Sequence, residues 1–172
     1  VRRDVASATR LKLALVQGNI PQEEKWLEEK MEEIIGRYVV LSEKAEREAL
    51  DLLVWPEASY PAVIPPEIRR VDLLSSLRVP LLMGVVTYEG IIPEEWPPSP
   101  DNTNFRLHNS AVFISTGGWI GGRYDKNHHD PLGEYVTLPR ILFFLNKVVP
   151  MISSFTPVKE LNLLSLTPSM PL

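Results

Sequence analysis

The stretch that decides the fold is Asp51–Pro61, DLLVWPEASYP. Its four consecutive apolar residues, Leu52–Trp55, predict a strand buried on both faces, because a strand covered on one face alternates apolar with polar residues. Pro56 has no backbone N–H to offer a sheet, so the strand ends there and Glu57 follows its carboxyl end. Ligands of open α/β sheets bind at such strand ends. Glu57 is therefore a candidate site residue, although a solvated loop acid is an equally simple interpretation.

The residues before this strand predict a βαβ unit. Val1–Arg10 is polar and lacks periodicity, so we interpret it as a connector. Leu11–Gly18 alternates weakly and then becomes apolar, which predicts a first strand. Residues 22–50 carry apolar side chains at helical spacing, which predicts one long amphipathic helix that Gly36 could interrupt. The two strands should be parallel and joined by a right-handed crossover.

The residues after the unit predict a further helix and three strands. Pro65–Leu77 is expected to be a shorter helix that begins with proline. Val79–Tyr88 and Leu107–Thr116 predict a third and a fourth strand. Gly117 and Gly118 indicate a hairpin turn, after which Trp119–Lys126 should return antiparallel. The fold class is therefore α/β, a mixed sheet with helices packed on it.

The remaining segments are rich in proline, with 16 prolines in 172 residues. Glu89–Asn104 should be an irregular loop, and its part Ile92–Pro100 could alternatively be a polyproline docking segment. Pro139–Pro150 has an apolar, aromatic face that predicts an amphipathic helix. We interpret residues 11–172 as one domain or a large part of one, since this length can bury roughly 70% of its unfolded surface.

The composition excludes several kinds of function. The formal net charge is −4 and no Lys/Arg cluster occurs, which argues against a nucleic-acid partner. No run approaches the roughly 20 apolar residues of a transmembrane helix. The chain contains no cysteine, so it holds no disulfide, zinc–thiolate site or thiol nucleophile. It begins with Val1 rather than Met, which we interpret as a sign of a fragment or a processed segment.

Five sequence motifs follow one another between about Leu11 and Pro157. They are LALVQGNIPQEEKW (Leu13–Trp26), LLVWPEASYP (Leu52–Pro61), HNSAVFIS (His108–Ser115), RYDKNHHDPLGEYVTLP (Arg123–Pro139) and SSFTP (Ser153–Pro157). In this order the sequence resembles the carbon–nitrogen hydrolase (nitrilase) superfamily, and within it the apolipoprotein N-acyltransferase branch. The motifs are specific together, although no single one is.

The resemblance implies an α-β-β-α sandwich, incomplete at its C-terminus, with a Glu-Lys-Cys triad. Glu57 would be the general base that activates the thiol, and Lys126 would stabilise the oxyanion of the tetrahedral intermediate. Glu134 would orient the nucleophile region and the lysine. Trp26 would lie near the substrate, and a core position on the long helix is the alternative. No cofactor and no metal are implied.

The resemblance also implies a reaction and its partners. An acyl group would pass from a phospholipid to the cysteine thiol and then to the N-terminal amine of a diacylglyceryl apolipoprotein. The site would lie beside a membrane surface, at the periplasmic face of the bacterial inner membrane, with the preceding transmembrane helices absent here. The nucleophile would lie beyond Leu172, so we expect a truncated catalytic domain that is inactive alone.

Some residues depart from the family pattern. Asp130 stands where an apolar residue is usual, and Leu132 replaces a usual Phe. A non-catalytic remnant or binding module that keeps Glu57 and Lys126 is therefore an alternative, as is an amidase or nitrilase-type hydrolase.

The histidines and two of the serines suggest two other kinds of site. His108, His128, His129 and Asp130 could suggest a metal site, but the adjacent His128 and His129 would point to opposite sides of an extended segment, and the chain has no thiolates. Ser153 or Ser154 could be a nucleophile, but no G-x-S-x-G turn surrounds either.

Overall fold

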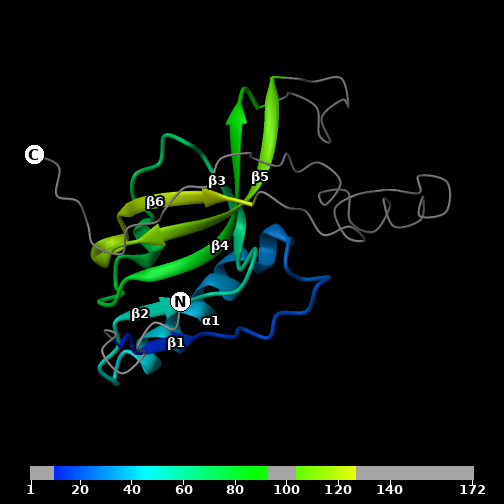
Figure 1. Cartoon of the computed structure of the whole chain (residues 1–172). Coiled ribbons are helices and arrows are strands. Elements are labelled where there is room, and N and C mark those ends of the chain that lie inside the picture. The colour runs from blue at the N-terminus through cyan, green and yellow to red at the C-terminus, as the bar shows by residue number, and fades with distance from the viewer. Residues whose placement is uncertain (1–9, 93–103, 127–172) are drawn as a thin grey trace, which may run out of the picture.

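A computed structural model describes residues 10–92 and 104–126, which form a mixed sheet and one α-helix (Figure 1). Its strands are β1 (Leu13–Leu15), β2 (Leu52–Val54), β3 (Tyr60–Ile64), β4 (Leu81–Gly90), β5 (Phe105–Ile114) and β6 (Ile120–Asp125). Helix α1 spans Met31–Ala45, and short 3-10 turns occupy η2 (Glu28–Lys30), η3 (Asp72–Leu74) and η4 (Thr116–Gly118). Figure 1 shows β4 and β5 extending together toward the top of the view.

The six strands form one sheet in the order β1-β2-β4-β5-β6, and β3 also pairs with β4. β1, β2 and β3 are parallel to their neighbours, whereas β5 and β6 are antiparallel to theirs. β2 pairs with β4 at Leu81 and Leu82, and β3 pairs with it at Val85–Thr87. β5 pairs with the opposite edge of β4, so β2 and β3 both lie along the same edge of β4. β2 and β3 therefore follow one another beside β4, and the turn between them lies within the sheet.

The main core lies between α1 and one face of the sheet. The buried side chains of the helix pack there against strand residues such as Leu53, which is completely buried. The rings of Tyr38 and Trp55 stack with centroids 4.8 Å apart. The indole N–H of Trp55 donates a hydrogen bond of 2.9 Å to Ser42 Oγ, so both buried polar groups are satisfied. These contacts fix the chain two residues before Glu57.

The predicted strands are confirmed, with ends that shift by a few residues. The parallel pairing of the first two strands and the antiparallel return after the Gly117-Gly118 turn are confirmed as well. The predicted helix at Pro139–Pro150 and the connector before Arg10 lie outside the described residues. Within residues 10–92 and 104–126, no helix is long and apolar enough to cross a membrane.

The helix expected over residues 22–50 is shorter than predicted. Residues 22–26 form turns, η2 follows, and α1 itself runs through Gly36 without a break. Trp26 packs on the sheet against a separate apolar cluster that includes Val86 and Phe105. We attribute the late start of the helix to this contact, because a side chain bound to the sheet draws its segment off the helical path.

The helix expected at Pro65–Leu77 is wrong, since η3 is the only helical turn there. The segment instead bonds to the β5–β6 turn: Val71 N–H donates to Gly118 O and Ile120 N–H donates to Arg69 O, both at 2.8 Å. The sequence analysis also missed β3, in which Pro61 obscures the strand pattern.

Candidate active site

Glu57 lies in the turn that separates β2 from β3, opposite Gly84 on β4. Gly84 N–H donates to Pro56 O at 3.2 Å, and Gly84 O accepts from Ser59 N–H at 2.8 Å. A Cβ atom at position 84 would lie only 2.5 Å from Glu57 Cα, so the turn can approach β4 only over a glycine. Ala58 has φ of 46°, a left-handed conformation that costs free energy in a residue with a side chain. The turn that presents Glu57 is therefore tightly constrained.

Lys126 directly follows β6 and meets Glu57 across the sheet. Lys126 Nζ lies 3.0 Å from Glu57 Oε1, and Asn109 Nδ2 donates to the same oxygen. Lys126 N–H donates to Asn109 O at 2.8 Å, so the lysine is bound to β5 through its backbone. The acid and the amine that the sequence analysis singled out are thus in direct contact, although 69 residues separate them.

Stability alone does not account for this ion pair. The side chains of Lys126 and Glu57 are 26% and 58% exposed, and ion pairs open to water contribute little to folding. The same openness leaves both charged groups accessible to a ligand. The ion pair therefore contributes little to stability, and both of its charges can reach a ligand.

A cavity of about 320 Å³ opens beside the pair. Its walls are mainly apolar and include Val54, Leu82 and Ala111, while Glu57 and Lys126 contribute opposite charges at one place. Apolar walls with a few convergent polar groups are typical of small-molecule sites. The carboxylate can accept a proton, and the ammonium can stabilise negative charge that develops on a nearby oxygen.

A second ammonium, Lys25, contacts the Glu57 turn. Lys25 Nζ donates to the backbone oxygen of Glu57 at 3.3 Å and lies 5.8 Å from the centroid of the Trp26 ring. Burial lowers the pKa of Lys25, and the negative charge of Glu57 partly opposes that shift. The site therefore holds a second lysine, which contacts the backbone of the Glu57 turn.

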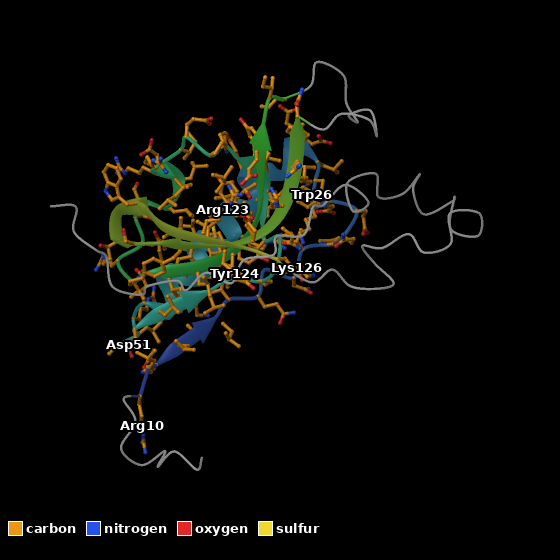
Figure 2. All side chains as sticks on the ribbon, turned by 45° about the horizontal axis from the view of Figure 1, so that its top comes forward. Arg10, Trp26, Asp51, Arg123, Tyr124 and Lys126 are labelled. Atoms are coloured by element: carbon orange, nitrogen blue, oxygen red, sulfur yellow. The ribbon has the colours of Figure 1, made fainter. Side chains whose placement is uncertain are left out.

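Trp26 does not lie on α1, so its expected place on the long helix is wrong, whereas its packing against apolar residues agrees with the core alternative. It is half-buried, in a turn before η2, and it packs against the cluster that contains Val86. Figure 2 marks Trp26 together with Lys126, the residue that carries the ammonium of the pair. Its proposed contact with substrate stays a prediction.

The sequence analysis missed three residues of the site, namely Lys25, Gly84 and Asn109. Two of them stand inside the motifs that carried the family resemblance, Lys25 beside Trp26 and Asn109 in HNSAVFIS. Their position inside these motifs was the sequence signal that could have identified Lys25 and Asn109 as site residues. Gly84 had none, because its role depends on the turn that packs against it.

Several predicted residues lie outside the described part of the chain. Glu134 is one of them, as are His128 and His129. In residues 10–92 and 104–126, no group of three or more His, Asp or Glu side chains is placed to hold a metal ion.

Two relatives of the chain carry the same name, apolipoprotein N-acyltransferase. The chain is 36% identical over 151 residues to the apolipoprotein N-acyltransferase of Geobacter metallireducens, covering 85% of this chain and 27% of that protein. It is 30% identical over 169 residues to the apolipoprotein N-acyltransferase of Agrobacterium fabrum, covering 92% of this chain and 30% of the relative. The chain thus spans less than a third of the length of these relatives.

The chain is also similar to solved structures and matches a family model. The chain matches the glutamine-dependent NAD+ synthetase of Acinetobacter baumannii with a TM-score of 0.50 and 16% identity, covering 87% of this chain and 24% of that one. It also matches a carbon–nitrogen hydrolase from Helicobacter pylori with a TM-score of 0.47 and 16% identity, covering 87% of this chain and 45% of the other. The family model for carbon-nitrogen hydrolases matches residues 12–158. The chain therefore belongs to the carbon–nitrogen hydrolase family.

Proposed function

We propose that this chain is part of an apolipoprotein N-acyltransferase, in which Glu57 and Lys126 act on an acyl group bound in the cavity. The 36% identity to the Geobacter metallireducens relative supports the choice of reaction. The observation that carries the proposal is the contact of 3.0 Å between Lys126 Nζ and Glu57 Oε1 at the edge of that cavity.

In the first half of the reaction, a cysteine thiol supplied from outside these 172 residues attacks the ester of a phospholipid. The thiol proton passes to Glu57, the sulfur bonds to the ester carbon, and the carbonyl electron pair moves onto oxygen. Lys126 stabilises that oxyanion with its fixed positive charge. The intermediate collapses to a thioester, and the departing lysophospholipid oxygen takes the proton from Glu57.

In the second half, the N-terminal amine of a diacylglyceryl apolipoprotein attacks the thioester carbon. Lys126 again stabilises the oxyanion, Glu57 takes the proton from the amine, and the sulfur leaves as a thiolate. The proton on Glu57 then returns to the thiolate, so the products are an amide and the regenerated cysteine thiol. Because the same two residues serve both halves, loss of either should stop the cycle at its first step.

The hydrogen bonds of Glu57 are consistent with a role as base. Lys126 and Asn109 both donate to Oε1, and no donor among the described residues reaches Oε2. Oε2 is therefore the oxygen proposed to exchange a proton with the thiol. The two donors hold the carboxylate in one orientation while the other oxygen remains available.

We further propose the second sheet and the remaining site residues that the family architecture implies. Leu13 and Leu15 on β1 are 49% and 79% exposed, which is unusual for strand leucines. A second sheet, as in an α-β-β-α sandwich, would cover such residues. Glu134 would support Lys126 from outside the described residues, Trp26 would contact substrate, and the site would lie at the periplasmic face of the inner membrane.

The lack of cysteine favours one competing function, a non-catalytic member of the family that binds a ligand but transfers nothing. An amidase-type hydrolase would use the same Glu57 and Lys126 with water as the acceptor. The acceptor therefore distinguishes the hydrolase from the transferase, and the presence of a thiol distinguishes both from the binding protein.

The experiment uses the 172-residue chain and the polypeptide encoded by the complete reading frame, each incubated with phospholipid vesicles and a diacylglyceryl lipopeptide. Mass spectrometry should find a hydroxylamine-sensitive acyl adduct on a cysteine of the longer polypeptide and none on the 172-residue chain. Glu57→Gln and Lys126→Met should abolish the adduct, whereas the exposed controls Glu67→Gln and Lys44→Met should not.

Three results would count against this function. A reading frame without cysteine would favour the binding protein. Release of free fatty acid without an acylated lipopeptide would favour the hydrolase. An acyl adduct on the 172-residue chain itself would show that the proposed nucleophile is wrong.

A further inference from the structure

We infer that Asp125 is a positioning residue, which holds the end of β6 from the face of the sheet opposite the cavity so that Lys126 reaches Glu57. The effect of this placement on acyl transfer rests on the proposed function. The placement itself does not, because it concerns only the geometry of the ion pair.

The two faces follow from strand register. Ser110 pairs with Asp125 across β5 and β6, and paired residues of antiparallel strands point to the same face. Consecutive residues of a strand point to opposite faces, so Asn109 and Lys126 belong to the other face, which is the face of the cavity. Figure 2 marks Arg123 and Tyr124, which precede Asp125, and Lys126, which follows it.

Asp125 is bonded on its own face to neighbours on two strands. Its Oδ1 accepts from Ser110 Oγ and from Arg123 Nε, both at 2.6 Å, and its Oδ2 accepts from Arg123 Nη2 at 2.8 Å. Ser110 Oγ is also 2.7 Å from Thr87 Oγ1 on β4. Burial raises the pKa of Asp125, but the hydrogen bonds and charge of Arg123, with Ser110 and His108, hold that pKa below its usual value.

The network continues to β4 through Glu89. Arg123 Nη2 lies 3.3 Å from Glu89 Oε1, and His108 Nε2 lies 3.6 Å from Glu89 Oε2. Residues from β4, β5 and β6 are therefore cross-linked by polar contacts on one face. Asp125 is the member of this network that directly precedes Lys126 in the chain.

This arrangement restricts the lysine from two directions. Its backbone N–H bonds to Asn109 O at 2.8 Å, and the residue before it is held by Ser110 and Arg123. A lysine side chain has many rotamers, so a fixed starting point greatly narrows the space its ammonium samples. A catalytic cation must be held within about 0.5 Å of its productive position, and this network supplies such a constraint.

The test measures how readily Lys126 reacts with acetic anhydride in the full 172-residue chain, with peptide mass spectrometry to quantify each lysine. An ammonium held by a carboxylate reacts slowly, so loss of the constraint should raise its rate. Asp125→Ala and Ser110→Ala should each raise labelling of Lys126 by roughly two- to fivefold, the factor that corresponds to losing a partly exposed ion pair. Glu57→Gln gives the reference for complete loss of the pair.

The matched control is Asp72→Ala, which removes an aspartate paired with an arginine (Arg70, 3.2 Å) at an exposed position. It should leave Lys126 labelling unchanged. Lys44 in each variant reports nonspecific changes, and circular dichroism reports folding. Ser110→Ala keeps the Asp125–Arg123 pair, so it tests the inference even if Asp125→Ala unfolds.

An unchanged Lys126 rate in folded Asp125→Ala and Ser110→Ala would overturn the inference. A uniform rise at all lysines, with loss of the circular dichroism signal in both variants, would overturn it too, because the network would then serve stability alone. Neither readout depends on acyl transfer, so failure of the proposed function would not be mistaken for failure of this inference.

Discussion

Gly84→Ala should destabilise the protein, because the turn that carries Glu57 leaves no room for a methyl group. The added Cβ would lie 2.5 Å from both Glu57 Cα and Pro56 O and 2.6 Å from Ala58 N. Carbon atoms in contact normally lie about 3.5–4.0 Å apart, so the turn would have to move by about 1 Å. All three neighbours are backbone atoms, which cannot move aside by changing rotamer.

Overpacking typically costs 1–3 kcal/mol, and the rigid neighbours here place the expected loss at about 3 kcal/mol. For a chain of this length, such a loss lowers the melting temperature by about 6–12 °C. Urea unfolding followed by circular dichroism measures the free energy directly.

Gly36→Ala is the matched control, because no atom other than its chain neighbours and the nearby backbone of its own helix lies within 4 Å of the Cβ it would add. Position 36 lies inside α1, where alanine should stabilise the helix by about 0.5–1 kcal/mol. The same substitution should therefore act in opposite directions at the two positions. A Gly84→Ala variant as stable as the parent chain would refute the described approach of the turn to β4.

Three further predictions concern single side chains. Ser42→Ala leaves the buried N–H of Trp55 without its acceptor and should cost about 1–3 kcal/mol in urea unfolding; in a Trp55→Phe background the same change should cost less. Asp125→Asn should destabilise the chain at neutral pH, because a carboxyl with a lowered pKa contributes stability above its unfolded pKa. The difference in free energy of unfolding between the parent chain and this variant should shrink as the pH falls below about 3.8 and through the lower folded pKa. Urea unfolding over a pH series measures it, and a difference that stays constant with pH would contradict the prediction. The pKa of Lys25, followed by carbon-13 NMR, should lie below that of exposed lysines. Glu57→Gln should lower the pKa of Lys25 further, because the charge of Glu57 raises it. A Lys25 pKa equal to that of exposed lysines would contradict the described burial.

Much of the sheet could be predicted from sequence, because its strands carry apolar runs bounded by clear breaks. Leu52–Trp55 ends at Pro56, and the strand before Gly117 ends in a turn that only glycines suit. β3 could not be predicted in this way. It contains Pro61 and begins directly after the Glu57 turn, so its pairing depends on β4 being in place.

Helical periodicity was a weaker guide. Residues 22–30 have helical spacing but form turns, because Trp26 packs on the sheet instead of continuing α1. The apolar residues of the segment before Leu77 are buried without a helix, since its backbone bonds to the β5–β6 turn. In both cases contacts with distant residues override local propensity.

The Glu57–Lys126 contact could be anticipated only through the family resemblance. Glu57 by itself reads as a loop acid, and Lys126 as an ordinary solvated lysine. Asn109 and Lys25 stand inside the motifs of that resemblance, but their contacts with Glu57 depend on the three-dimensional arrangement, since each reaches Glu57 from another element. The contact between acid and amine thus depends on the whole sheet order.

The central claim is that Glu57 and Lys126 share one site, and zero-length cross-linking tests it most directly. A carbodiimide joins a carboxylate to an amine only when the two are in contact, and Lys126 Nζ lies 3.0 Å from Glu57 Oε1. Mass spectrometry of the folded, cross-linked chain should find a peptide that joins these two residues and that is absent from Lys126→Met. A folded chain in which Glu57 couples to other lysines and never to Lys126 would contradict the account.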